Sequence, residues 1–262
     1  MSYTQNKGGG SVLRRTIDDI LREWRPEAEA DGIRIVGGDD GRPKVQVRLD
    51  LGLLQIELEG RPDGLQPHGF ASLLDYHLAA AEAHRQRCGT VEDYRLDPAE
   101  CDALRREAAQ YYQRYLSLHQ IQRHREVARD TARNLRVLEF LRQHAAAPED
   151  SWELEQFRPY ITMMNALARA EMHVADYDFG AAERILVTSM AAIRSFAAQH
   201  VGQVDVAREL DVLGQRLRQV KRVRPKSERE LVRRQLDAAI QREDYEAAAL
   251  LRDRLAGLAG RV

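Results

Sequence analysis

The hydrophobic pattern begins with a series at helical spacing. This series consists of Leu13, Ile17, Ile20, Leu21 and Trp24. Ser11 is placed to cap such a helix and Pro26 to end it, so we expect a surface helix between them. Residues 1–10, which include three consecutive glycines, precede it as an expected disordered N-terminus.

Beyond this helix, apolar and polar residues alternate, a pattern typical of β-strands with one buried face. The alternating apolar residues are Ile33, Ile35, Val45, Val47, Leu49, Leu54, Ile56 and Leu58. If the turn lies at residues 51–52, Val47 faces Ile56 and Lys44 faces Glu59. We expect two or three antiparallel strands that helices cover on one face.

From about residue 69, helical periodicity predicts a helical body that extends to residue 220. The expected helices span residues 70–81, 97–144, 152–175, 179–199 and 206–220. Asp97 and Glu100 form a capping pattern for the second of them. The last has apolar residues at spacings of four and three, as in a coiled-coil seam. Residues 176–178 separate two of the helices and predict a helical hairpin there.

The C-terminal region contains two short amphipathic series on either side of the polar residues 241–244. The apolar positions are Val232, Leu236, Ala239 and Ile240 in the first series and Tyr245, Ala248, Ala249 and Leu251 in the second. This spacing predicts two helices that fold back on each other. A hairpin this short buries too little apolar surface to be stable alone, so it requires the rest of the chain or a partner's matching hairpin.

The residue identities in this hairpin are more specific than their spacing. After Ala239-Ile240 come the strings Glu243-Asp244-Tyr245-Glu246, Ala248-Ala249 and Leu251-Arg252-Asp253. Residues 227–258 thereby resemble the UVR motif, the helical hairpin through which the UvrB and UvrC subunits of bacterial excision repair bind each other. The resemblance implies protein-protein interaction, with another protein that bears a UVR-like hairpin or with a second copy of the chain. It also implies a connection to DNA repair or stress response.

The expected contact face of the hairpin combines apolar residues with one charge pair. Its apolar members are Leu236, Ile240, Tyr245, Ala249 and Leu251. Arg252 and Asp253 lie near the end of the second helix, where a charge pair at the rim of an interface can orient the partner. The alternatives are a solvated helix end for these two residues and, for the hairpin, a helix pair that only completes the chain's own core.

These patterns predict a mainly α fold, a bundle of helical hairpins with a small N-terminal antiparallel β-hairpin and a C-terminal helical hairpin. The expected parts are a disordered N-terminus at 1–10, a helix and β-hairpin unit at 11–68, a helical body at 69–220, a basic linker at 221–226 and the UVR-like hairpin at 227–262. The linker has one proline and four basic residues, so we expect it to be exposed and to let the hairpin reach a partner.

Composition limits the classes of protein that fit. The 40 basic and 41 acidic side chains leave a net charge of -1, so no overall field attracts the chain to nucleic acid or membrane. No apolar run approaches the roughly 18 residues of a membrane span, and no signal-peptide pattern is present. We therefore expect a cytoplasmic protein. Cys88 and Cys101 are too few and too widely spaced for a disulfide framework or a zinc site.

No arrangement of residues in the sequence predicts catalysis, a cofactor or a metal. A phosphate-binding glycine loop, a Glu-x-x-His pair and a His-Glu-x-x-His motif are all missing. His119 and His124 lie beside Arg123 and Arg125, a cationic setting that discourages metal binding. The zinc motifs of arginine-kinase activators, which share the hairpin, are also missing. We expect a protein that is not an enzyme.

Two alternatives to docking stay open. A nucleic-acid-binding accessory factor would use the helix face formed by Arg125, Arg129, Arg133 and Arg136, with Lys221, Arg222, Arg224 and Lys226 of the linker. Against this interpretation, Glu126 and Asp130 are spaced to pair with the arginines along the helix. The other alternative, an enzyme with an unrecognised site, requires ionisable groups that converge in a cleft.

Overall fold

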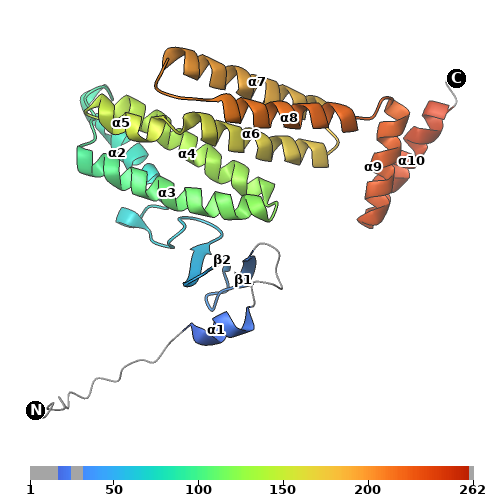
Figure 1. Cartoon of the computed structure of the whole chain (residues 1–262), viewed down its shortest axis with the longest axis horizontal. Coiled ribbons are helices and arrows are strands. Elements are labelled where there is room, and N and C mark those ends of the chain that lie inside the picture. The colour runs from blue at the N-terminus through green and yellow to red at the C-terminus, as the bar shows by residue number, and fades with distance from the viewer. Residues whose placement is uncertain (1–16, 25–31, 260–262) are drawn as a thin grey trace, which may run out of the picture.

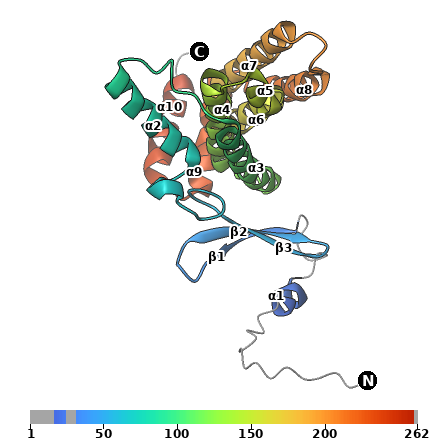
Figure 2. The same cartoon turned by 90° about the vertical axis from the view of Figure 1, so that its left-hand side faces the viewer.

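The computed structural model describes residues 17–24 and 32–259. In this part of the chain a small sheet lies between the short helix α1, Asp18–Glu23, and a body of long helices (Figure 1, Figure 2). The last two helices form a separate pair at the far end of the body (Figure 1). The predicted mainly α fold, with N-terminal antiparallel strands and a C-terminal helical hairpin, is confirmed.

Only part of the expected N-terminal helix lies within the described residues, where α1 begins at Asp18 and ends at Glu23. Ser11 and Pro26, its expected ends, lie outside the described residues, as does the expected disordered stretch 1–10. Trp24, which follows α1, is buried. The Arg34 guanidinium lies over the Trp24 ring, 4.1 Å from the ring centroid, and this cation-π contact joins the end of α1 to the sheet.

The sheet has three antiparallel strands in the order β1-β2-β3. Their bounds are Ile33–Gly37 for β1, Pro43–Leu49 for β2 and Gly52–Glu57 for β3. Val45 on β2 pairs with Ile56 on β3, which the predicted register placed opposite Val47. Val45 and Ile56 are both buried in the main core, so the alternating pattern did identify the face that packs against the helices.

The predicted position of the β2–β3 turn is wrong by one residue. The turn lies at residues 50–51, not at 51–52, and Lys44 therefore pairs with Glu57 and not with Glu59. The partner strand is displaced by two residues, and a displacement of two keeps every side chain on its predicted face. Alternation alone could not distinguish the two registers for this reason.

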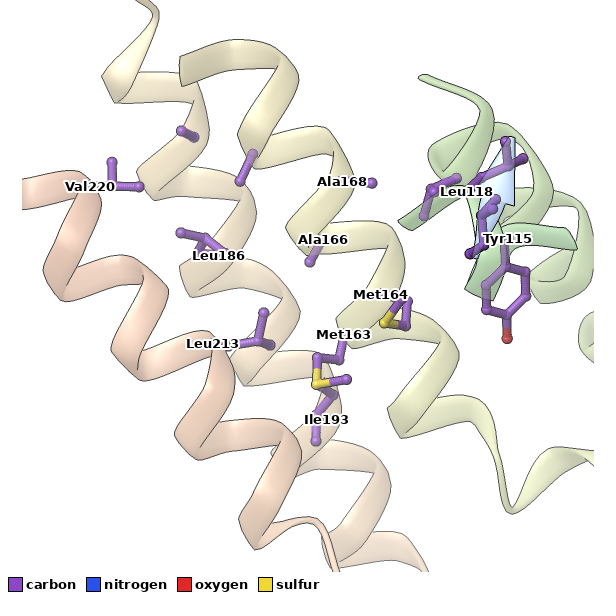
Figure 3. Packing of buried hydrophobic residues seen from close by; sticks show 14 of the residues in the cluster. Tyr115, Leu118, Met163, Met164, Ala166, Ala168, Leu186, Ile193, Leu213 and Val220 are labelled. Carbon is purple, nitrogen blue, oxygen red and sulfur yellow. The ribbon is translucent and has the colours of Figure 1, made fainter. Parts of the chain in front are cut away.

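A 3₁₀ helix and seven α-helices form the described body. Their bounds are Pro67–Gly69 for η2, Leu73–Cys88 for α2, Pro98–Gln120 for α3, His124–His144 for α4, Pro148–Glu155 for α5, Arg158–Ala175 for α6, Phe179–Gln199 for α7 and Ala207–Val223 for α8. Helices α3, α4, α6, α7 and α8 pack in sequence, each beside the next (Figure 1). Their shared core includes Leu118, Met164, Leu186, Leu213 and Val220 (Figure 3).

Two helices expected to be continuous are each divided. The prediction of one helix over 97–144 is wrong because Gln122, with φ 58°, separates α3 from α4. The single helix expected over residues 152–175 is likewise divided, at Gln156 and Phe157, into α5 and α6. Apolar residues on both sides of Gln122 face one core, so the helical period continues across the break and does not reveal it.

A buried ion pair fastens the sheet to the body. Arg114 of α3 and Asp130 of α4 are each 1% exposed, and Arg114 donates two hydrogen bonds, of 2.7 and 2.8 Å, to the Asp130 carboxylate. The same guanidinium donates to the carbonyl oxygens of Glu57 and Gly60, each at 2.8 Å. One guanidinium, that of Arg114, thus supplies hydrogen bonds both to a carboxylate and to the backbone that follows β3.

We predict that Asp130→Ala lowers the free energy of unfolding by about 3–5 kcal/mol, because it leaves the Arg114 charge buried without its partner. Urea unfolding followed by circular dichroism measures this loss. Asp102→Ala is the matched control, since Asp102 pairs with Arg106 on an exposed helix face and its loss costs no more than about 1 kcal/mol. If the two variants lose equal free energy of unfolding, the Arg114–Asp130 pair does not have this stabilising role.

Candidate functional site

The C-terminal hairpin consists of α9, Glu228–Gln241, and α10, Tyr245–Ala259 (Figure 1). The Ser227 hydroxyl caps α9 by accepting the Glu230 backbone N–H at 3.2 Å. A three-residue connection joins the helices, and within it Glu243 has φ 58°. Asp244 ends the connection and caps α10 by accepting the Ala247 backbone N–H at 3.1 Å.

The inner face of the hairpin is made of small and branched apolar residues. Val232 is fully buried, and Ala239 and Ala248 are nearly so. Alanine at these positions lets the two helix backbones approach closely. At the open end, Arg254 forms an ion pair with Glu228 at 2.7 Å. The hairpin therefore closes on itself along one side.

The outer face of the hairpin exposes large apolar side chains. Ile240 is 52% exposed, Tyr245 69% and Leu250 74%. Ala249 is exposed as well. Single exposed apolar residues are ordinary on a soluble protein, but a group of them on one small unit is typical of an interaction surface.

The structure divides the seven predicted contact residues between these two faces. Leu236 and Leu251 are half-buried on the inner side. Ile240, Tyr245 and Ala249 lie outside, where Arg252 and Asp253 are also exposed and contact each other at 3.4 Å. Sequence reasoning missed Leu250. Because Leu250 and Leu251 are adjacent on one helix, about 100° apart, one of the two had to point away from the packed face.

The connection between α9 and α10 has a close counterpart inside the body. Between α6 and α7, Tyr177 has φ 60°, and the Asp178 backbone N–H donates to the His173 carbonyl oxygen at 2.8 Å. In the terminal hairpin the Asp244 N–H donates to the Ala239 carbonyl oxygen at 3.0 Å in the same way. The expected helical hairpin at residues 176–178 is confirmed.

This equivalence pairs the residues of the two hairpins. Tyr177 corresponds in geometry to Glu243, so Phe179 corresponds to Tyr245. Phe179 is 6% exposed because α4 and α8 flank the α6–α7 pair. Tyr245 has no such cover among the described helices. The outer face of α9–α10 therefore resembles a body hairpin from which the flanking helices have been removed.

Several contacts hold the hairpin against the body. Arg224 pairs with Glu183 of α7 at 3.2 Å, and Arg234 donates to the Val223 carbonyl oxygen at 3.0 Å. Leu231 packs against the main core. The expected basic linker over 221–226 is too long, because α8 continues to Val223 and includes its first residues.

The arginine stripe proposed for nucleic acid is largely occupied by internal partners. Arg129 donates to the Leu58 carbonyl oxygen at 2.8 Å, and Arg133 pairs with Glu107 and lies 4.1 Å from the Tyr111 ring centroid. The exposed members are Arg125 and Arg136 on α4 and Lys221, Arg222, Arg224 and Lys226 near the start of the hairpin.

The described residues, 17–24 and 32–259, contain neither a metal-binding cluster nor a helix that could span a membrane. No group of three or more His, Cys, Asp or Glu side chains in these ranges is arranged to hold a metal ion. None of the helices there combines the length and apolar composition that crossing a bilayer requires.

Comparison with known proteins identifies the hairpin. The family model of the UvrB/uvrC motif, UVR, matches residues 226–259, which span α9 and α10. No curated protein and no solved structure matches the chain. The chain thus carries a UVR motif at its C-terminal hairpin, and UVR motifs generally mediate contacts between proteins.

We predict that Glu243→Gly stabilises the hairpin by about 1 kcal/mol, because glycine accepts the left-handed backbone of residue 243 without the steric cost that a side chain has there. Amide hydrogen exchange of α9 and α10 measures the local free energy of opening. Glu246→Gly, in the first turn of α10, is the matched control and should destabilise by about 1 kcal/mol. Destabilisation by both variants would show that the turn does not need this conformation.

Proposed function

We propose that this protein is a non-catalytic docking protein whose UVR hairpin binds a matching helical hairpin, on another protein or on a second copy of the chain. The observation that carries the proposal is the exposure of Ile240, Tyr245 and Leu250 on a helix pair that no other described helix covers extensively. The UVR match supports it, because the motif's general role is contact between proteins.

The energetics favour a partner of at least the hairpin's own size. Burying a fully exposed large apolar side chain contributes about 1.5–3 kcal/mol. Because Ile240, Tyr245 and Leu250 are 52%, 69% and 74% exposed, together they contribute roughly 3–6 kcal/mol. Association costs about 4–15 kcal/mol in lost translational and rotational freedom. The three side chains alone give at most weak binding, whereas a matching hairpin adds its own apolar residues and completes a four-helix arrangement.

Charge supports a role for Arg252 and Asp253 in orienting that partner. Both side chains are more than 70% exposed, and their mutual contact of 3.4 Å is long for an ion pair. An exposed pair of this kind contributes little to stability, so exchanging it for partner charges costs little. A connection of the complex to DNA repair rests on the UVR motif itself.

The described cavities do not favour an enzyme. A cavity of about 1010 Å³ is lined by charged residues of which two pairs are joined to each other. Glu139 pairs with Arg142 at 2.6 Å, and Arg158 donates to Glu155 at 2.9 Å. General acid-base or nucleophilic chemistry needs groups whose protons or lone pairs are free to reach a substrate.

Nucleic-acid binding is the second candidate function, and one observation favours it. Lys221, Arg222 and Lys226 are exposed near the junction of α8 and α9, and none of them has an ion-pair partner within the described ranges. The internal partners of Arg129 and Arg133 argue against the α4 face.

Fluorescence anisotropy with labelled single- and double-stranded DNA across a salt series distinguishes this candidate from docking. A protein that acts by docking alone shows no binding in the micromolar range even at low salt. Micromolar binding that weakens steeply with salt, and that Lys221→Glu with Lys226→Glu abolishes, would establish the nucleic-acid function instead.

For docking itself, we predict that Tyr245→Asp with Leu250→Asp removes the specific partners that the intact chain captures from lysate, or its self-association in sedimentation velocity. Both side chains are more than two-thirds exposed, so neither belongs to the buried packing of Val232, Ala239 and Ala248. Leu250 also borders a cavity between the hairpin and the end of α6.

Leu51→Asp with Val201→Asp is the matched control, since it places two charges at exposed apolar positions far from the hairpin. The control variant should behave as the intact chain does. If both double variants are folded and retain the same partners and the same sedimentation, the hairpin's outer face is not the docking surface.

A further inference from the structure

A second candidate binding site lies in the body, away from the hairpin. A cavity of about 400 Å³ opens between α3, α5 and α6, with one residue of α4 at its wall. Most of its lining is apolar or aromatic: Ala109, Tyr112, Tyr115, Leu154, Phe157 and Tyr160. Its volume falls within the roughly 300–1,000 Å³ typical of small-molecule pockets.

The aromatic rings in this cavity lie at different depths. Tyr112 and Phe157 are more than a third exposed and form the mouth, whereas Tyr115 is 1% exposed and forms the base. The Tyr112 and Tyr115 ring centroids are 5.4 Å apart in an edge-to-face arrangement, and Tyr160 lies 6.2 Å from Tyr112. Rings at these angles leave faces and edges against which a further aromatic ring can pack.

The Tyr115 hydroxyl is an unpaired polar group at the base of the cavity. None of the described residues hydrogen-bonds it, although the side chain is almost completely buried. Its ring extends away from Leu118 and lies apart from the methionines of the core (Figure 3). Burial raises the pKa of Tyr115, which keeps the hydroxyl neutral and available as a donor. A hydroxyl without a protein partner that lines a cavity can bond water there, and a ligand oxygen can replace that water.

The remaining polar groups of the cavity already have partners. Arg105 donates to the Asp150 carbonyl oxygen at 3.0 Å and pairs with Glu153 at 3.1 Å. Asn134 donates to the Ala108 carbonyl oxygen at 3.0 Å. A charged ligand would find no free opposite charge here and would have to lose its hydration without compensation.

We propose that this cavity binds a neutral, planar aromatic molecule that carries a hydroxyl or carbonyl group. Its ring packs against Tyr112 and Tyr160, and its oxygen hydrogen-bonds the Tyr115 hydroxyl. The site is independent of the docking function of the hairpin and gives the helical body a role of its own.

The experiment is a fluorescence titration of the intact protein with 2-naphthol, which is planar, neutral at pH 7 and hydroxylated. We expect a dissociation constant below about 1 mM for 2-naphthol. Naphthalene, which lacks the hydroxyl, should bind about tenfold more weakly, because it loses the net contribution of one hydrogen bond. The anion 2-naphthalenesulfonate should bind at least as weakly as naphthalene.

Three variants locate the binding. Tyr115→Phe should weaken 2-naphthol about tenfold and leave naphthalene unchanged. Ala109→Phe, at an exposed helix position on the cavity wall, should fill the space and abolish binding of both. Tyr111→Phe is the matched control, because Tyr111 is a buried neighbour that does not line the cavity, and it should bind as the intact chain does.

The proposal is overturned if folded intact protein binds no 2-naphthol, or if Ala109→Phe binds it unchanged. If Tyr115→Phe and the intact chain bind 2-naphthol with equal affinity, the Tyr115 hydroxyl is not the group that hydrogen-bonds the ligand. If no small aromatic molecule binds, the remaining occupant to test for this cavity is an aromatic side chain of a protein partner. None of these results depends on whether the hairpin docks.

Discussion

The architecture depends on one constraint: a pair of amphipathic helices cannot bury all of its apolar surface alone, so a further element must cover it. The α6–α7 hairpin meets the constraint inside the chain, where α4 and α8 flank it and Phe179 is buried. The α9–α10 hairpin is built on the same connection, yet Tyr245 at the equivalent position is exposed. The position that is core in the body is therefore surface in the UVR hairpin, and under the proposed function a docked partner covers it.

A few contacts join this hairpin to the rest of the structure. The Arg114–Asp130 pair joins α3 to α4 and, through the carbonyl oxygens of Glu57 and Gly60, joins both helices to the sheet. Removing one partner of such a buried pair is costly because it leaves the other charge buried and uncompensated. At the other end of the body, the Arg224–Glu183 contact sets where the hairpin begins. The hairpin thus begins beside the N-terminal end of α7, and no other described helix covers its outer face extensively.

The features of the fold that the sequence predicted correctly are those for which the local hydrophobic pattern and the tertiary packing agree. Val45 and Ile56 reached the predicted core face even though their strand register was shifted, because burial selects the face and not the register. The break at Gln122 escaped prediction since one core receives the apolar residues of both α3 and α4. Within the site, periodicity grouped Leu236 with Tyr245, although one packs inward and the other is exposed. The lone hydroxyl of Tyr115 depends on residues distant in sequence, so no local pattern could reveal it.

Photo-cross-linking in living cells tests the central claim most directly. A benzophenone amino acid in place of Tyr245, and separately in place of Val187, gives two probes of similar size on the same folded chain. If the UVR hairpin is the docking surface, position 245 forms a discrete covalent adduct with one protein or with a second copy of the chain, and position 187, which is half exposed on α7, does not. Identical adducts from both positions, or none from position 245 while position 187 reacts, would contradict the account.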